Sequence, residues 1–271
     1  MYQVRGMYRE NPFHNWYHGF SVLHFTYITL KTLAPEMASY LNPAEVMGLL
    51  VASLCHDVDH PGFNNTYEIV TESERAIKYN DISVLENHHS YVMLMILRQY
   101  DIFKNFERLN YRAVKKFMVN SVLATDMSVH FSTCSSLDSR SPEAPFTKSD
   151  ADRQLFSNML IHSSDLSAQT FVTNVALEWE SRITTEFMHQ VECEKKAGLE
   201  VTKMMNNLDD IVIRNKSQLG FIDYMLLPWW KNVSRLFPSL TPCLDNLLLN
   251  RQHYAQIVQQ HTAPTQEDKS A

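Results

Sequence analysis

Two histidines and two aspartates lie together in the segment His-Asp-Val-Asp-His at residues 56–60. His56 and His60 are four residues apart, so on a helix their side chains would project about 40° from one another. The apolar run at 49–55 before them is typical of a buried helix. Burying an imidazole beside a carboxylate is costly unless both bind a cation. The segment therefore predicts a divalent metal site, although a helix C-terminus that favours histidines would also explain these five residues alone.

Other parts of the chain offer ligands of the same kind. His14 and His18 are four residues apart and would face one way on a helix, as two nitrogen ligands or as one ligand and one proton donor. Asp165 ends an apolar helical segment, although taken alone such an aspartate is more often an N-cap. His18, His56, Asp57 and Asp165 together give two nitrogens and two carboxylates, which suits Zn²⁺.

The surplus of carboxylate oxygens suits a second, harder ion, Mg²⁺ or Mn²⁺. Two such cations would share a bridging water and lower its pKa, so that the resulting hydroxide attacks phosphorus while the cations offset charge on the phosphoryl oxygens. His14 would stay off the metals and protonate the leaving oxygen. We expect His60, Glu86 and Asp126 to hold waters bound to the cations.

Composition favours a helical globular protein of moderate size. The 271 residues include only 6 glycines but 13 methionines, which argues against a sheet-rich fold with many tight turns. The formal charge of −6 gives no reason to expect a nucleic-acid polymer as partner. Four scattered cysteines without CxxC spacing predict free thiols in a reducing compartment. No apolar run is long enough for a transmembrane segment, so we expect a cytoplasmic protein unless a segment outside this chain tethers it to a membrane.

The pattern of apolar residues predicts an all-α fold in one compact domain at 1–261, followed by a disordered tail at 262–271. Asn42 and Pro43 are a helix start signal, and Gly198 is a helix end signal. Ser83 and Glu86 have the spacing of a capping box. Residues 135–150 are predicted as an exposed loop. Helices are expected at 13–33, from 43 into the His-Asp segment, and at 66–79, 83–100, 111–127, 154–164, 171–196, 207–233 (bent or divided at Pro228) and 240–261.

Several ordered motifs give the chain a family resemblance over roughly residues 10–260. The motifs are PFHNWYH at 12–18, HDVDHPGFNN at 56–65, YNDISVLENHH at 79–89, LATDM at 123–127, HSSDLS at 162–167 and QLGFIDYMLLP at 218–228. With these motifs in this order, the chain resembles the catalytic domain of class I cyclic nucleotide phosphodiesterases, a branch of the HD-type metallohydrolases.

The resemblance implies an all-helical fold with zinc and magnesium at the base of a pocket. By it, His14 is the general acid and the metal ligands are His18, His56, Asp57 and Asp165. It also implies that Gln218 binds the purine, that Phe221 and Ile183 form the walls on either side of the base, and that Asn65 and Glu86 lie near the phosphate and the metal waters. Without the resemblance, Gln218 would be a surface glutamine, and Phe221 and Ile183 would be core residues. His88, His89, His130 and His162 receive only a structural role.

The chain departs from the family pattern at three places. Ala168 stands where an asparagine usually follows Asp-Leu-Ser, Phe13 stands where tyrosine is common, and only 13 residues precede His14, so some N-terminal helices of the domain would be lacking. The resemblance implies hydrolysis of 3′,5′-cyclic nucleotides (cAMP, cGMP or both) to 5′-monophosphates, with possible regulatory domains outside this chain. Two alternatives are an HD-class phosphohydrolase acting on non-cyclic nucleotides and a non-catalytic module that binds cyclic nucleotides.

Overall fold

Helix α4 (Pro43–Cys55) begins where the sequence predicts. The Asn42 side chain accepts the backbone N–H groups of Ala44 and Glu45 at 2.9 and 3.0 Å, and the Glu45 carboxylate accepts the Asn42 N–H at 2.9 Å. These reciprocal hydrogen bonds satisfy backbone N–H groups that have no partner within the first turn of a helix. Pro43 at the first helical position has no N–H group, so it loses no hydrogen bond there. Helix α4 is mostly apolar and runs through the centre of the molecule, so its end delivers His56 and Asp57 into the interior.

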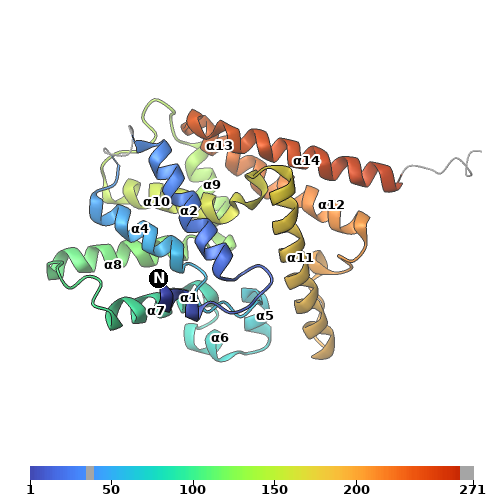
Figure 1. Ribbon diagram of the computed structural model, residues 1–271, viewed down its shortest axis with the longest axis horizontal. Coiled ribbons are helices and arrows are strands. Elements are labelled where there is room, and N and C mark those ends of the chain that lie inside the picture. The colour runs from blue at the N-terminus through green and yellow to red at the C-terminus, as the bar shows by residue number, and fades with distance from the viewer. Residues whose placement is uncertain (35–39, 263–271) are drawn as a thin grey trace, which may run out of the picture.

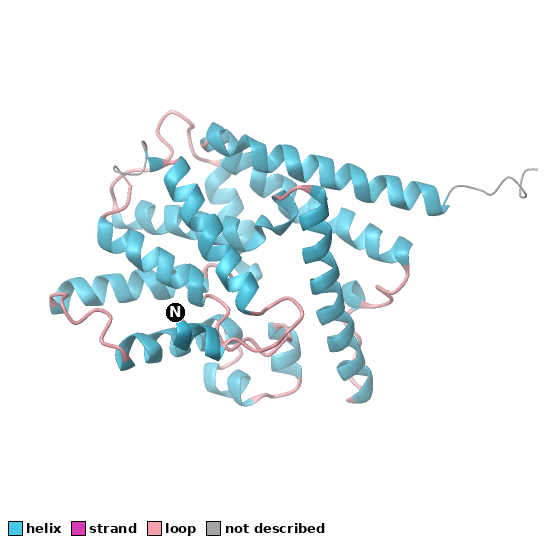
Figure 2. Cartoon of the chain, in the orientation of Figure 1, coloured by secondary structure: helices cyan, strands magenta, loops and turns pink. Residues whose placement is uncertain are grey.

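The computed structural model describes residues 1–34 and 40–262. Within these ranges every regular element is a helix and there is no strand, which confirms the all-α prediction (Figures 1 and 2). The predicted tail lies outside the described residues from 263 onward, and the division at 261 stays a prediction. Beside α4, the α-helices are α1 Tyr2–Met7, α2 Trp16–Thr32, α5 Asn65–Val70, α6 Glu74–Tyr79, α7 Val84–Gln99, α8 Arg108–Leu123, α9 His130–Asp138, α10 Asp150–Asp165, α11 Thr173–Lys196, α12 Ile211–Phe221, α13 Leu227–Leu236 and α14 Thr241–Thr262.

The helices that carry the predicted site pack against one another at the centre of the fold. Helix α2 lies on α4 and α10, while α8 covers the other side of α4 and also contacts α10 (Figure 1). Helix α14 runs along α12 and α13 at the top of the view. The core between these layers contains fully buried Trp229, Trp230, Phe156 and Phe237. Burying such large side chains removes much apolar surface from water and so holds the layers in place.

Several helix boundaries differ from the sequence-based predictions; α8, for example, is Arg108–Leu123 instead of 111–127, and α1 was not predicted. The expected helix at 66–79 is two helices, α5 and α6, because Ser73 caps a new helix start by accepting the N–H of Ala76 at 3.1 Å. The helix predicted at 13–33 is α2 and begins at Trp16, since Asn15 accepts the N–H of Tyr17 and caps it. The predicted loop at 135–150 begins only after Asp138, where α9 ends. At Ser73 and Asn15 the difference comes from a local polar contact that apolar periodicity does not register.

The segment predicted to bend at Pro228 is divided there. A π-helical turn, η4 (Ile222–Leu226), joins α12 to α13, and Pro228 lies at the start of α13. A proline has no N–H to give the preceding turn, and a wider turn accommodates the missing bond. Gly198 lies directly after α11 with φ +67°, a left-handed conformation in which glycine is favoured, so its predicted end role is confirmed.

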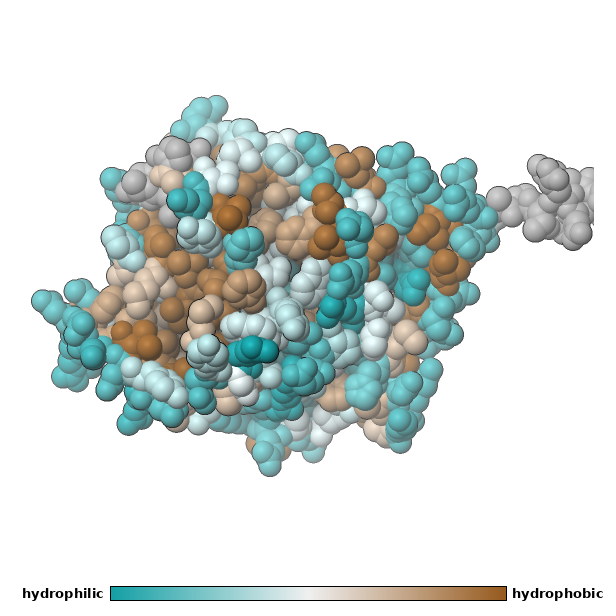
Figure 3. Space-filling model, viewed as in Figure 1, coloured by the Kyte–Doolittle hydropathy of each residue, from teal (hydrophilic) through white to brown (hydrophobic). Residues whose placement is uncertain are grey.

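Two predictions about the chain as a whole can be compared with the described residues. No helix there has the length and apolar character needed to cross a membrane. All four cysteines are unpaired, as predicted. Figure 3 shows an apolar area over α2 and α4, where Phe20 and Tyr27 are each close to half exposed. Short 3₁₀ turns connect several helices, namely η1 Met127–Val129, η2 Leu166–Thr170, η3 Lys203–Met205 and η5 Pro238–Leu240.

Candidate active site

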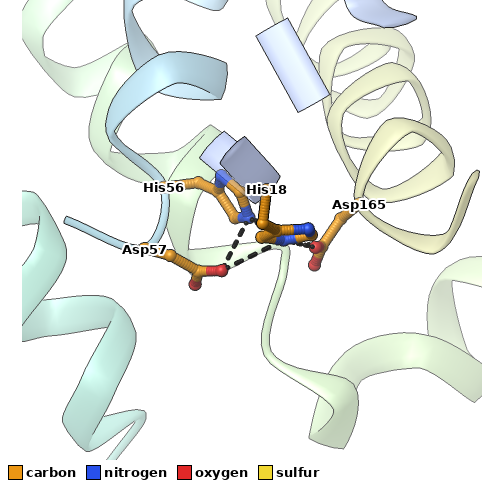
Figure 4. Close-up of side chains that lie close together, drawn as sticks. All are labelled: His18, His56, Asp57 and Asp165. Carbon is orange, nitrogen blue, oxygen red and sulfur yellow. Dashed lines mark hydrogen bonds and ion pairs between the residues drawn. The ribbon is translucent and has the colours of Figure 1, made fainter. Parts of the chain in front are cut away.

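Four side chains from three helices meet at the centre of the fold (Figure 4). His18 lies in the first turn of α2, His56 and Asp57 directly follow α4, and Asp165 is the last residue of α10. The Nε2 atoms of His18 and His56 are 3.1 Å apart. Asp165 Oδ1 lies 3.0 Å from the first nitrogen and 3.2 Å from the second. Asp57 Oδ2 lies 3.2 and 3.0 Å from the same two nitrogens.

This spacing fits a bound divalent cation. Ligand atoms that share one ion at about 2.0–2.2 Å lie about 2.8–3.6 Å apart when they are neighbours in an octahedral or tetrahedral shell. Five of the separations among the four donor atoms are 3.0–3.2 Å, and all four atoms lie within 4.8 Å of one another. The donor set therefore suits an ion that accepts both nitrogen and oxygen ligands.

The His56 ring is oriented for the same purpose by a backbone carbonyl. Its Nδ1 lies 3.0 Å from the carbonyl oxygen of Ser53, one turn back in α4, so Nδ1 carries the proton in the neutral ring. The lone pair on Nε2 then faces the other donors. Histidine ligands of metal ions commonly have such a partner on the second nitrogen, because it fixes the ring and its tautomer.

The electrostatics of the four donors favour a positive charge between them. Burial raises the pKa of Asp57 and of Asp165, but the His56 and His18 imidazoles outweigh it and hold both carboxyl groups well below their usual range. Burial lowers the pKa of His56, and the two carboxylates more than reverse this. Two ionised, buried carboxylates are costly unless a cation offsets them. A cation between these donors removes that cost.

His14 lies beside the cluster and is held by an acid that the sequence did not single out. Its Nδ1 contacts Glu186 Oε1 in α11, and Glu186 Oε2 accepts the backbone N–H groups of Phe13 and His14 at 2.9 and 3.1 Å. Burial lowers the pKa of His14, but the Glu186 carboxylate raises it to about 9. The contact leaves Nε2 as the ring atom that can donate a proton elsewhere.

His60 stacks on one face of the His14 ring. The ring centroids are 3.9 Å apart and the planes differ by 13°. Burial and the positive charge of His14 hold the pKa of His60 well below its usual range. Its Nδ1 accepts the Gly62 N–H at 3.0 Å, so the neutral ring carries its proton on Nε2. A neutral imidazole beside a charged one avoids the repulsion that two imidazolium rings would suffer.

Glu86 and Asp126 approach the centre from a second direction. Glu86 is buried in the first turn of α7 and accepts both contacts of the Asn65 side-chain amide, at 3.2 and 3.0 Å. Burial raises the pKa of Glu86 to about 7, with further contributions from the negative charges of Asp126 and Asp57. Asp126 accepts the Ser83 hydroxyl at 2.7 Å. The predicted capping box at Ser83 is therefore wrong, because this hydroxyl bonds Asp126 and Ser83 has a positive φ of 41°.

The remaining acid of the His-Asp segment points away from the cluster. Asp59 forms an ion pair with Arg9 at 2.7 Å and contacts His88 Nε2 at 2.7 Å. His89, for which the sequence predicted only a structural role, lies closer to the site, with Nδ1 2.8 Å from the Val58 carbonyl and Nε2 3.7 Å from Asp57 Oδ1. His130 and His162 contact each other at 2.9 Å in the core.

The residues predicted to bind the base lie on α11 and α12. Gln218 and Phe221 are one turn apart on α12, so they share a face, and Ile183 lies one turn before Glu186 on α11. Among the described residues no hydrogen bond or ring contact joins these three side chains to the four donors. Their roles stay predictions.

Ala168, which stands where the family usually has an asparagine, lies at the edge of the site. It lines a narrow crevice together with His18, Asp165, Phe171 and Trp179.

Comparison with known proteins decides the family. A model of the 3′,5′-cyclic nucleotide phosphodiesterase family matches residues 13–247. The chain belongs to this family. The solved phosphodiesterase domain of the RhoPDE fusion protein from the choanoflagellate Salpingoeca rosetta superimposes with a TM-score of 0.90 at 32% identity, covering 96% of this chain and 82% of that one.

Two curated phosphodiesterases show how much of a relative this chain represents. The mouse high-affinity cGMP-specific 3′,5′-cyclic phosphodiesterase 9A is 33% identical over 94% of this chain and 48% of its own length. The Drosophila melanogaster 3′,5′-cyclic-AMP phosphodiesterase, isoform F, is 33% identical over 97% of this chain and 40% of its own. The chain thus spans about half the length of these relatives, or less.

Proposed function

We propose that the chain hydrolyses 3′,5′-cyclic nucleotides to 5′-monophosphates by breaking the bond between phosphorus and the 3′ oxygen. The observation that carries this proposal is the pairing of two features in one buried place. Four donors lie 3.0–3.2 Å apart, as a cation requires, and His14, held by Glu186, lies beside them. Family membership supports the same reaction.

We propose that His18, His56, Asp57 and Asp165 hold a divalent pair, Zn²⁺ with Mg²⁺ or Mn²⁺. When bound, such ions activate water as a nucleophile and offset negative charge on the phosphoryl oxygens. The protein's part is to fix the ligands in place. Helix α4 does so through the Ser53 carbonyl on His56, and α10 does so by ending at Asp165.

His14 then serves as the general acid. Glu186 holds its Nδ1 and keeps the imidazole protonated near neutral pH, because the pKa of His14 is raised to about 9. The Nε2 proton can pass to the departing 3′ oxygen, which would otherwise leave as an alkoxide. His60, stacked on the ring, restricts its rotation.

Glu86, Asn65 and Asp126 are proposed to bind water and phosphate oxygens beside the cations, together with His60. Asn65 Oδ1 accepts the Leu85 N–H at 2.9 Å, which turns its amide N–H groups toward Glu86. With a pKa of about 7, Glu86 can exchange a proton with water near neutral pH. Ser83 orients the Asp126 carboxylate.

The base is proposed to lie between Phe221 and Ile183 and to bond the Gln218 amide. An amide both donates and accepts, so one glutamine suits adenine or guanine according to its rotation. The named relatives include one cGMP-specific enzyme and one cyclic-AMP enzyme. We therefore propose both nucleotides as substrates, and the absence of an amide at Ala168 removes one further constraint on the base.

The test is a side-by-side hydrolysis of cAMP and cGMP by the purified chain with added Mg²⁺ or Mn²⁺. We expect release of 5′-AMP or 5′-GMP and no 3′-monophosphate. Linear nucleoside mono- and triphosphates serve as controls, since an HD-class phosphohydrolase of the other kind would consume those instead. Turnover of linear nucleotides alone, or no turnover of any nucleotide with metal bound, would refute the proposal.

A further inference from the structure

Helix α8 carries a basic stripe along its exposed face. Arg108, Arg112, Lys115 and Lys116 are all exposed and fall within about 100° of the helix circumference. The opposite face packs into the core through Val114, Phe117, Met118 and Val122. Arg98, in the last turn of α7, and Lys104, on the connection from α7 to α8, are also exposed, so six cations lie on α8 and the segment before it.

These cations have no internal partners. Among the described residues, none of the six forms an ion pair or a side-chain hydrogen bond. Asp101 and Glu107 are the acids within the same segment, and the chain as a whole has a net charge of −6. A local excess of positive charge on an acidic protein is a surface suited to an anionic partner. Figure 1 places the start of α8 at the left-hand edge of the molecule, where Figure 3 shows a hydrophilic rim.

Apolar groups lie directly beside the stripe. Leu109 is 75% exposed in the first turn of α8, and Ile102 and Tyr100 on the preceding connection are 48% and 51% exposed. A surface cavity of about 310 Å³ opens on the adjoining side of α8, between this helix and the start of α4, lined in part by Phe106, Ala113 and Val114. A solvated charged face needs neither exposed aliphatic side chains nor an apolar hollow next to it.

This surface is separate from the active site. The cavity touches Asn42, Ala44 and Glu45 at the start of α4, whereas His56 and Asp57 follow its end. The 13 residues of α4 span about 20 Å. Contact at the α8 surface would therefore leave the four metal donors uncovered.

We propose that the α8 surface docks on an anionic phospholipid bilayer. The stripe would contact lipid phosphates and carboxylates, and Leu109 and Ile102 would enter the boundary between headgroups and acyl chains. A basic face with adjacent aliphatic groups is the combination that peripheral membrane contacts use, because each charge adds attraction and each apolar group adds burial. The proposal does not depend on the catalytic assignment.

The experiment measures co-sedimentation of the full chain with vesicles of phosphatidylcholine alone or with about 30% phosphatidylserine, in about 0.1 and 0.5 M NaCl. We expect binding to the anionic vesicles only, weakened by salt. R108E/R112E/K116E should lose at least about tenfold in affinity. L109S should also weaken binding, with less change in salt dependence.

The matched control is K195E/K196E/K203E, which changes the net charge equally at exposed lysines in the last turn of α11 and in the following turn η3. It should bind as the unmodified chain does. Circular dichroism and a hydrolysis assay in solution are used to check that all variants are folded. Equal binding to both vesicle types, or equal losses in the α8 and control variants, would overturn the proposal. Failure to bind the anionic vesicles would also overturn the proposal, and an acidic protein would then be the alternative partner to test.

Discussion

Glu186 accepts from His14 at both ends of the residue, through the ring Nδ1 and through the backbone N–H at 3.1 Å. The two residues are 172 positions apart, and Glu186 is almost fully buried on α11. A buried carboxylate that bonds both the imidazole and the backbone N–H of one histidine fixes the position of that ring and favours its protonated form. In the proposed mechanism this contact distinguishes the two histidines, with His18 in the first turn of α2 as a metal ligand and His14, which precedes that helix, as the proton donor.

Removing the imidazole tests the proton donor. H14A should lower turnover of cyclic nucleotides by about 10²–10⁴-fold, because the leaving oxygen loses its acid. Zinc content, measured by atomic absorption, should be unchanged, since His14 is not among the four donors. H24A is the matched control, as His24 is exposed on α2, the helix that follows His14. Near-normal turnover in H14A would show that another group donates the proton.

Neutralising Glu186 tests the origin of the raised pKa. The pKa of His14 is raised to about 9, so its stabilising charge is fully present below its ordinary value near 6.5 and is lost as pH rises through about 9. E186Q should therefore move the alkaline limb of the kcat/KM profile to lower pH and cost little at pH 6. E178Q changes an exposed glutamate of the same helix and should leave the profile in place. An unshifted limb in E186Q would separate this carboxylate from the acid.

Metal removal should expose the role of Asp165 in stability. Binding to the folded state raises the melting temperature, so adding Zn²⁺ to chelator-treated protein should raise Tm by several degrees. In D165N this rise should shrink, because a ligand is lost and affinity falls by more than about tenfold. D59N is a fitting control, since Asp59 bonds Arg9 and His88 away from the cluster. An undiminished rise in D165N would place the ion elsewhere.

The cap at the start of α4 gives a prediction about the fold. N42A should lower the free energy of unfolding by about 1 kcal/mol, because the N–H groups of Ala44 and Glu45 lose their acceptor. N42D keeps an acceptor at this place and should cost much less. Urea unfolding of the two variants gives the comparison, and equal losses would mean that the side-chain cap contributes nothing.

Short-range signals in the sequence predicted most of the long helices, and together with the family resemblance they predicted that the four donors converge. His18, His56 and Asp57 belong to contiguous motifs, and the caps at Asn42 and Gly198 are local too. Glu186 was missed, since a single glutamate within a long helix carries no sign of burial until the fold brings α11 against Phe13. Ser83 was misassigned for a similar reason, because its partner, Asp126, is 43 residues away.

The most direct measurement of the central claim is anomalous diffraction at the zinc absorption edge from crystals grown with Zn²⁺. We predict a peak at about 2.0–2.2 Å from His18 Nε2, His56 Nε2 and one oxygen each of Asp57 and Asp165, with His14 outside the coordination shell. Absence of a peak among these four side chains, or a peak that includes His14 as a ligand, would contradict the account.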